Sequence, residues 1–248
     1  RGSFYPAGWP KARELEYAAG QVTMIEINGT FYSSQKPATW ADWARRTPDD
    51  FVFSVKASRF CTNRRVLCEG AESIDRFINQ GLAELGPKLG PILWQFAATK
   101  QFDPDDLRGF LALLPKSVGG IKLRHAIEPR HESFRDPALT EMARRAGVAI
   151  VFADASDKYP QFADLTADFV YARLQSQREE EPAGYPPDAL DHWAQTSRAW
   201  AAGDVPAGYA YTEPAANSAG GKRDVFILMI NGAKVRAPAA ARALIERL

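Results

Sequence analysis

The chain has 248 residues, of which 46% are hydrophobic and 25% are charged. These values are typical of a globular protein, and a chain of this length can bury a large core without disulfides or a bound metal. The formal net charge is only +1, which excludes a general electrostatic attraction to nucleic acid or to anionic membranes. A net charge near zero does not exclude a local patch of basic residues.

The cysteine content and the absence of long apolar runs indicate the cellular context. Only Cys61 and Cys68 occur, whereas an extracellular disulfide framework would normally carry more cysteines. No apolar run reaches the roughly 18–20 residues of a membrane helix, and the first residues have no apolar core like that of a signal peptide. The sequence therefore predicts a soluble, cytoplasmic protein with no membrane partner.

Short apolar runs alternate with amphipathic helical stretches along the whole chain. The strand candidates are residues 22–27, 51–55, 91–96, 121–127, 148–153, 169–174 and 225–230. The helix candidates are residues 11–19, 38–46, 73–85, 104–114, 137–146, 189–201 and 239–248. This alternation predicts parallel βαβ units in one α/β domain over 1–248, which is either a barrel or a doubly wound open sheet.

Each strand candidate carries a polar residue at or near its carboxyl end. In an α/β barrel the loops after these ends form the active site. The predicted catalytic residues are Glu26, Lys56, Glu128, His131 and Asp154, and the predicted ligand-binding residues are Asn28, Tyr32, Gln95, Arg130, Arg173 and Asn231.

Glu26 is a carboxylate inside a run that is otherwise apolar. A buried carboxylate is costly unless it is paired or hydrogen-bonded, and Lys56 and Arg130 are natural partners for Glu26 and Glu128. Two interpretations follow from the residues. The charges are either structural ion pairs in the mouth of the barrel or the ligand-binding and catalytic groups of an enzyme.

His131 is the histidine with the clearest functional context. It lies in the polar segment 128–132, where a histidine near carboxylates could act as a general acid or base. With Glu128 and Asp154 it could also bind a divalent metal, although no HxH or HExxH spacing supports this, and no cofactor is indicated. His125 fits a hydrogen-bonded core position equally well.

Aromatic residues accompany the first strand ends. Trp40 and Trp94 are predicted to pack in the core, whereas Tyr32, in the loop after Asn28-Gly29, is predicted to face a ligand. No phosphate-binding loop, GxGxxG or GxSxG motif is present, so the reaction class stays open.

Several short motifs resemble the domain-of-unknown-function 72 family, also called YecE-like proteins. They are Ile25 to Tyr32 (IEINGTFY), Phe51 to Ala57 (FVFSVKA), Leu89 to Gln95 (LGPILWQ), Glu128 to Phe134 (EPRHESF), Ala153-Asp154, Phe169 to Leu174 (FVYARL) and Ala237 to Ala241 (APAAA). The resemblance covers essentially the whole chain and implies a TIM-type barrel. It implies no reaction, because the family name records that none is established.

The sequence departs from the family pattern in four places. Family members normally have a further strand with a Gly-Thr-Ser-Gly-Trp-like motif before the segment that corresponds to 1–6, so the first barrel strand is expected to be lacking or replaced here. The family often has histidines where this chain has Asn63 and Gln175, and Leu-Pro-Pro where it has Phe96-Ala97-Ala98. These changes weaken any mechanism that depends on histidines at the mouth.

The sequence is compatible with two functions. The first is an enzyme, a hydrolase, lyase or isomerase, that acts on a small polar or phosphorylated ligand at the strand ends. The second is a non-catalytic module that binds nucleic acid or protein through the same mouth, with a basic patch formed by Lys122, Arg124, Arg130, Arg173 and Arg178. The oligomeric state leaves no signal in the sequence.

Overall fold

The computed structural model of the chain describes residues 4–155, 158–213, 220–230 and 232–248. Its strands are β1 (Met24–Ile27), β2 (Val52–Lys56), β3 (Leu89–Gln95), β4 (Ser117–Val118), β5 (Ile121–Lys122), β6 (His125–Glu128), β7 (Ala149–Ile150), β8 (Phe152–Asp154), β9 (Phe169–Leu174) and β10 (Asp224–Met229). The main strands are short and apolar because both of their faces are covered, by helices outside and by side chains of the ring inside.

The strands form a ring of parallel neighbours. One sheet has the order β1-β2-β3-β6-β7 and a second has the order β10-β9-β8. Only Val151 separates β7 from β8, so these are two halves of one strand that joins the sheets, and the Val151 amide donates to Ile127 on β6. The architecture is a TIM-type α/β barrel, as predicted.

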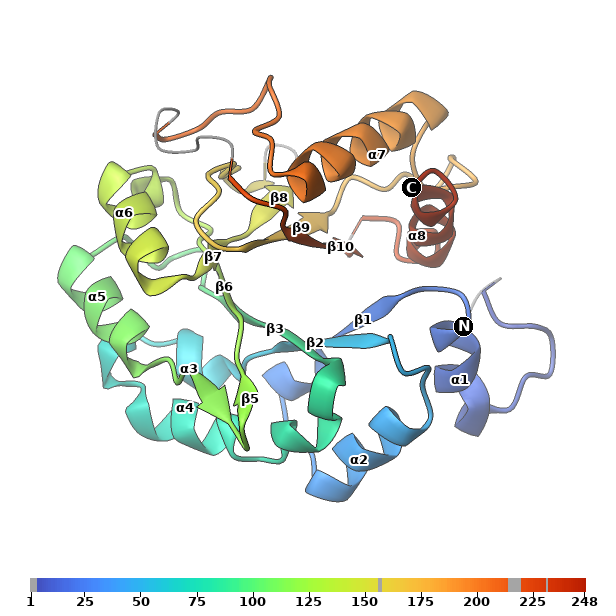
Figure 1. Cartoon of the computed structure of the whole chain (residues 1–248), viewed down its shortest axis with the longest axis horizontal. Coiled ribbons are helices and arrows are strands. Elements are labelled where there is room, and N and C mark those ends of the chain that lie inside the picture. The colour runs from blue at the N-terminus through green and yellow to red at the C-terminus, as the bar shows by residue number, and fades with distance from the viewer. Residues whose placement is uncertain (1–3, 156–157, 214–219, 231) are drawn as a thin grey trace.

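Helices cover the outside of the ring (Figure 1). They are α1 (Glu14–Ala19), α2 (Pro37–Arg45), α3 (Arg59–Thr62), α4 (Ala71–Ile78), α5 (Pro104–Leu113), α6 (Pro137–Ala146), α7 (Pro187–Ala202) and α8 (Ala237–Ile245), with 3-10 turns at Lys11–Arg13, Gly29–Phe31, Leu67–Glu69, Leu82–Lys88 and Glu132–Phe134. The carboxylates of Asp103 and Asp136 cap α5 and α6, and a proline follows each of them at the first helical position.

Two predicted elements differ from the structure. The predicted strand 121–127 is divided in two: its first residues form β5, which pairs antiparallel with β4, and the barrel strand β6 begins at His125. The predicted helix 73–85 ends at Ile78, because Gly81 takes the left-handed conformation and the chain continues as a 3-10 turn. The short helix α3 was not predicted.

The ring is open between β1 and β10. In the described residues, β1 pairs with β2 and β10 pairs with β9, but β1 and β10 do not pair with each other. A groove of about 610 Å³ lies between them, with α1 and α8 at its sides (Figure 1). This opening is where the sequence predicts that a first strand is lacking.

Apolar side chains fill the interior of the ring beneath its carboxyl end. Leu93, Ala126, Val151, Phe169 and Tyr171 belong to this inner cluster, whereas Trp40 and Trp94 lie in the larger core between sheet and helices, as predicted. In the described part of the chain, no helix is long and apolar enough to cross a membrane.

Candidate active site

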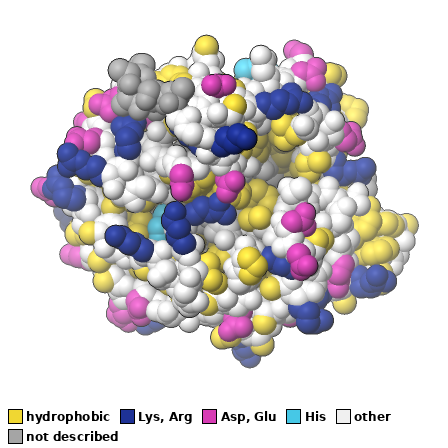
Figure 2. All heavy atoms as spheres, viewed as in Figure 1, with side chains coloured by type: hydrophobic (Ala, Val, Ile, Leu, Met, Phe, Trp, Pro, Cys, Tyr) yellow, Lys and Arg dark blue, Asp and Glu magenta, His cyan; other side chains and the backbone are white. Residues whose placement is uncertain are grey.

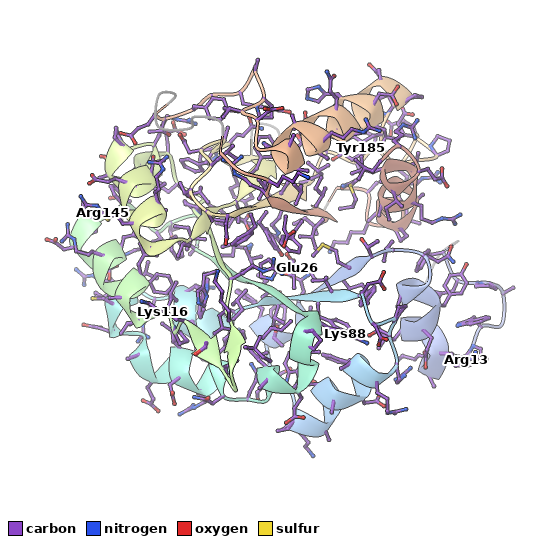
Figure 3. The ribbon with its side chains drawn as sticks, in the orientation of Figure 1. Arg13, Glu26, Lys88, Lys116, Arg145 and Tyr185 are labelled. Atoms are coloured by element: carbon purple, nitrogen blue, oxygen red, sulfur yellow. The ribbon has the colours of Figure 1, made fainter. Side chains whose placement is uncertain are left out.

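Arg173 lies at the centre of a buried charge cluster at the carboxyl ends of the strands. Its guanidinium donates to Glu26 Oε1 through Nη2 at 2.8 Å and to Glu128 Oε2 through Nη1. The three side chains are only 3%, 2% and 1% exposed, in that order. One arginine from β9 therefore ties together carboxylates from β1 and β6, on opposite sides of the ring (Figure 3 labels Glu26).

A second contact fixes the other oxygen of Glu26. Tyr171 OH donates to Glu26 Oε2 at 2.7 Å and lies 2.6 Å from Ser54 Oγ, which donates to the carbonyl of Pro91. Burial alone would raise the pKa of Glu26, but the Arg173 charge and the hydrogen bonds from Tyr171 and Arg173 outweigh it and lower that pKa. Glu26 is therefore a carboxylate near neutral pH, and its pairing with Lys56 that the sequence suggests does not form.

Lys56 is held by an amide instead of a carboxylate. Its Nζ donates to Gln95 Oε1 at 2.8 Å and lies 4.4 Å from the centre of the Phe31 ring. The Gln95 amide group in turn donates to Glu128 Oε2 at 3.3 Å. Burial and the nearby Arg173 charge lower the pKa of Lys56 to about 8.

Arg130 completes the cluster from the loop after β6. Its Nε and Nη2 donate to Glu128 Oε1 at 2.9 and 2.7 Å, as the sequence suggests for this pair. The guanidinium also lies 4.3 Å from the centre of the Tyr159 ring. Glu26, Lys56, Gln95, Glu128, Arg130 and Arg173 are referred to below as the mouth cluster.

Strand geometry explains why these residues meet. Side chains at i and i+2 on a strand point to the same face, so Ser54 and Lys56, and likewise Tyr171 and Arg173, share the inner face of the ring. The parallel register places Glu26 beside Ser54 and Gln95 beside Glu128. Tyr171 and Ser54 were not predicted as site residues from the sequence. Their i,i+2 spacing from Arg173 and Lys56 indicates that they face the same side of their strands as those residues.

Asp154 belongs to a separate group of hydrogen bonds. Its carboxylate accepts from Ser176 Oγ at 2.9 Å and from Tyr185 OH at 3.0 Å. Burial and the adjacent Asp154 charge raise the pKa of Tyr185, so this tyrosine stays protonated as a donor.

Three of the remaining predicted site residues, His131, Tyr32 and Asn28, lie around the mouth cluster. His131 Nδ1 accepts from the Ser133 amide, so its side chain caps the 3-10 turn Glu132–Phe134. Tyr32 is 68% exposed, and Asn28 donates weakly to the carbonyl of Glu26 at 3.5 Å. Asn231 lies outside the described residues.

His125 occupies a hydrogen-bonded core position, which is one of the roles compatible with the sequence. Its Nδ1 accepts from Trp94 Nε1 at 3.1 Å, and its Nε2 lies 2.7 Å from the Pro115 carbonyl, which assigns the proton to Nε2. Among the described residues, no three His, Cys, Asp or Glu side chains gather in a way that could hold a metal ion.

The basic patch predicted for nucleic acid does not form as one surface. Lys122 and Arg124 precede β6 and lie at the amino end of the barrel, whereas Arg130 follows β6 and lies at the carboxyl end. Arg173 is buried between two carboxylates. Residues at opposite ends of a strand cannot contact one ligand at the mouth, so this prediction was wrong.

The comparisons with known proteins agree with this fold. The sequence profile of the family described as "Protein of unknown function DUF72" matches residues 1–248. The chain belongs to the DUF72 family. No curated protein matches the sequence of this DUF72 protein.

Solved structures of other DUF72 family proteins are similar in fold. The structure from Enterococcus faecalis V583 has a TM-score of 0.71 at 15% identity, over 94% of this chain and 87% of that one. The structure from Thermotoga maritima MSB8 has a TM-score of 0.67 at 20% identity, over 99% and 92%. A structure named SacUVDE has a TM-score of 0.54 at 11% identity, over 94% and 83%. These likenesses concern the fold.

Proposed function

We propose that this DUF72 protein is an enzyme that binds a small polar ligand with an anionic group, phosphate or carboxylate, at the mouth cluster. The charge balance of the cluster carries the proposal. It holds the three cations Lys56, Arg130 and Arg173 but only the two carboxylates Glu26 and Glu128. An anionic ligand would supply the missing negative charge in a site where low solvent exposure strengthens each charge interaction.

Lys56 is the group best suited to receive that anion or to move a proton. Both carboxylates are engaged by arginines, whereas the Lys56 hydrogen bond goes to the neutral oxygen of Gln95. A pKa of about 8 allows Lys56 to exchange a proton near neutral pH, which general acid–base catalysis requires. Glu26 and Glu128 would then orient the cations and stabilise positive charge on the ligand, in a hydrolase, lyase or isomerase.

A nucleic-acid-binding function of the same mouth has less support. A polymer phosphate would have to compete with the buried Glu26 and Glu128 for Arg173, and these two carboxylates would repel it. A small ligand needs only Lys56 and the more accessible Arg130, whose side chain is 13% exposed.

Ligand screening with matched variants tests the proposal. The wild-type protein is screened by thermal shift against phosphorylated and carboxylated metabolites, and hits are assayed for binding and turnover. Lys56→Met should weaken binding by about tenfold or more, because a hydrogen bond to a charged group contributes about 1.5–3 kcal/mol. Wild-type turnover should depend on a group that titrates near pH 8, and Lys56→Met should remove that dependence.

The control is Lys36→Met, which removes one exposed lysine before α2 and should leave affinity and turnover unchanged. Binding without turnover across the panel would support a non-catalytic module instead of an enzyme. The proposal fails if Lys56→Met, Glu26→Gln and His131→Ala all bind and turn over the hits as the wild type does.

A further inference from the structure

A second cleft lies at the opposite end of the barrel from the mouth cluster. Its volume is about 990 Å³, and it is bounded by the ends of α5 and α6, the β4–β5 hairpin and the residues before β9 and β10. It is referred to below as the basal cleft. Figure 2 shows Lys and Arg side chains gathered on this side of the surface, and Figure 3 labels Lys116 and Arg145 there.

The lining of the basal cleft is strongly cationic. Its basic residues are Arg108, Lys116, Lys122, Arg124, Arg144, Arg145 and Arg223, and among the described residues Asp168 is the one carboxylate in the lining. Four of the five lining arginines pair with carboxylates that are not part of the lining. These pairs are Arg108–Asp105, Arg124–Asp224, Arg144–Glu213 and Arg145–Glu141. Lys116 and Arg223 form no ion pair in the described part of the chain, so the excess positive charge of the lining comes mainly from these two residues and from the weakly paired Lys122.

Part of this charge has an ordinary structural reason. Arg144 and Arg145 lie in the last turn of α6, where a cation offsets the negative end of the helix dipole. Lys116, Lys122 and Arg223 belong to no helix, so that reason does not apply to them. The Lys122 pair with Asp168 is long, 3.5 Å, and both side chains are more than 70% exposed, so it is too weak to prevent Lys122 from binding a ligand.

Two buried guanidinium nitrogens in the lining lack an acceptor in the described part of the chain. They are Nη2 of Arg144 and Nη1 of Arg223. A buried donor without an acceptor costs about 1–3 kcal/mol. Both nitrogens are closed off from solvent, so a ligand in the cleft would contact these two arginines through their other guanidinium atoms.

The floor of the cleft is apolar. Leu114, Leu123, Val148 and Phe169 are buried side chains that line it, and the Arg124 guanidinium lies 4.6 Å from the centre of the Phe226 ring. Small-molecule sites combine such an apolar lining with a few placed polar groups in volumes of roughly 300–1,000 Å³. A ligand that matches both parts has an apolar or aromatic body and several negative charges.

We propose that the basal cleft binds a phosphorylated organic molecule of nucleotide size. Its phosphates contact Lys116, Lys122, Arg144 and Arg223 at the rim, and its base or other apolar group rests on the floor around Leu123 and Phe169. This site is separate from the proposed active site, at the other end of the strands, and it does not depend on that proposal.

Isothermal titration calorimetry with ATP, with tripolyphosphate and with a short single-stranded DNA oligonucleotide tests the inference on the full chain. ATP should bind with one-to-one stoichiometry, and more tightly than tripolyphosphate, because only ATP uses the floor. The double variant Lys116→Glu, Lys122→Glu should weaken ATP binding by about tenfold or more, since each change replaces a cation with an anion at the rim.

The matched control is Lys11→Glu, Lys36→Glu, which makes the same charge change at exposed lysines outside the cleft lining and should alter ATP affinity less than about twofold. Lys56→Met should also leave it unchanged, which separates this site from the mouth cluster. The inference is wrong if ATP shows no saturable binding at low salt, if both double variants weaken it equally, or if the oligonucleotide binds and ATP does not.

Discussion

Arg173 is the residue on which the mouth cluster depends most. It is 3% exposed and is the partner of both Glu26 and Glu128, so its charge compensates two buried carboxylates from distant parts of the chain. Those two anions raise the pKa of Arg173 in spite of its burial, and it stays protonated. A neutral side chain at this position would leave two negative charges facing each other in a poorly solvated interior.

Replacing Arg173 with methionine should therefore destabilise the fold strongly. Loss of one partner of a buried ion pair typically costs about 3–5 kcal/mol, and here two carboxylates lose theirs. Urea unfolding of Arg173→Met measures the loss of free energy. Arg76→Met is the control, because Arg76 pairs with Glu72 on the surface of α4 and both are more than 75% exposed. Equal stability of the two variants would show that the Arg173 network contributes little.

At the scale of elements, Gly81 decides where a predicted helix ends. The segment 73–85 has a helical pattern, but Gly81 has φ +119° and turns the chain between α4 and the following 3-10 turn. A Cβ atom at Gly81 would lie 2.8 Å from Pro37 Cα and 2.8 Å from Trp40 Cδ1, both in α2. Close packing against α2 thus requires glycine here, and helix periodicity alone does not reveal it.

Gly81→Ala should lower the free energy of unfolding by about 2 kcal/mol or more, because left-handed strain adds to the clash with α2. The matched control is Gly221→Ala, since Gly221 has no left-handed φ and no atom within 4 Å of an added Cβ. Thermal or urea unfolding compares the two variants. A Gly81→Ala protein as stable as the control would mean that α2 moves aside at no cost.

At the scale of the whole molecule, the opening between β1 and β10 leaves two strand edges without partners in the described residues. Unpaired edges expose backbone amides and carbonyls, and such segments open more easily than central strands. The side chain of Glu26 is only 2% exposed, but the residue as a whole is half-buried. Its exposed surface therefore belongs to the backbone, which lies at the open edge of β1.

Hydrogen exchange should therefore be faster in peptides covering β1 and β10 than in a peptide covering β3, which is buried at every residue and paired on both sides. Mass spectrometry over a time course measures this, with β3 as the internal reference. Protection of β1 and β10 equal to that of β3 would show that their edges are covered in solution.

Local sequence patterns predict much of the fold and one ion pair of the site. The alternation of apolar runs and helical stretches predicts a parallel α/β fold, and the motif resemblance favours a barrel. The Asp-Pro pairs predict the starts of α5 and α6, because capping and proline geometry act within one turn. Glu128 and Arg130 are two residues apart, so their ion pair was also within reach of the sequence.

Only the tertiary structure decided which distant charges meet. Glu26 and Arg173 are 147 positions apart in the sequence, and Lys56 and Gln95 are 39 positions apart. Strand order and register bring each pair together, not local preference. The sequence by itself therefore determined the inventory of polar groups at the strand ends. The order and register of the strands determined that the carboxylates pair with arginines and that Lys56 has a neutral partner, because they bring side chains from distant strands into one buried space.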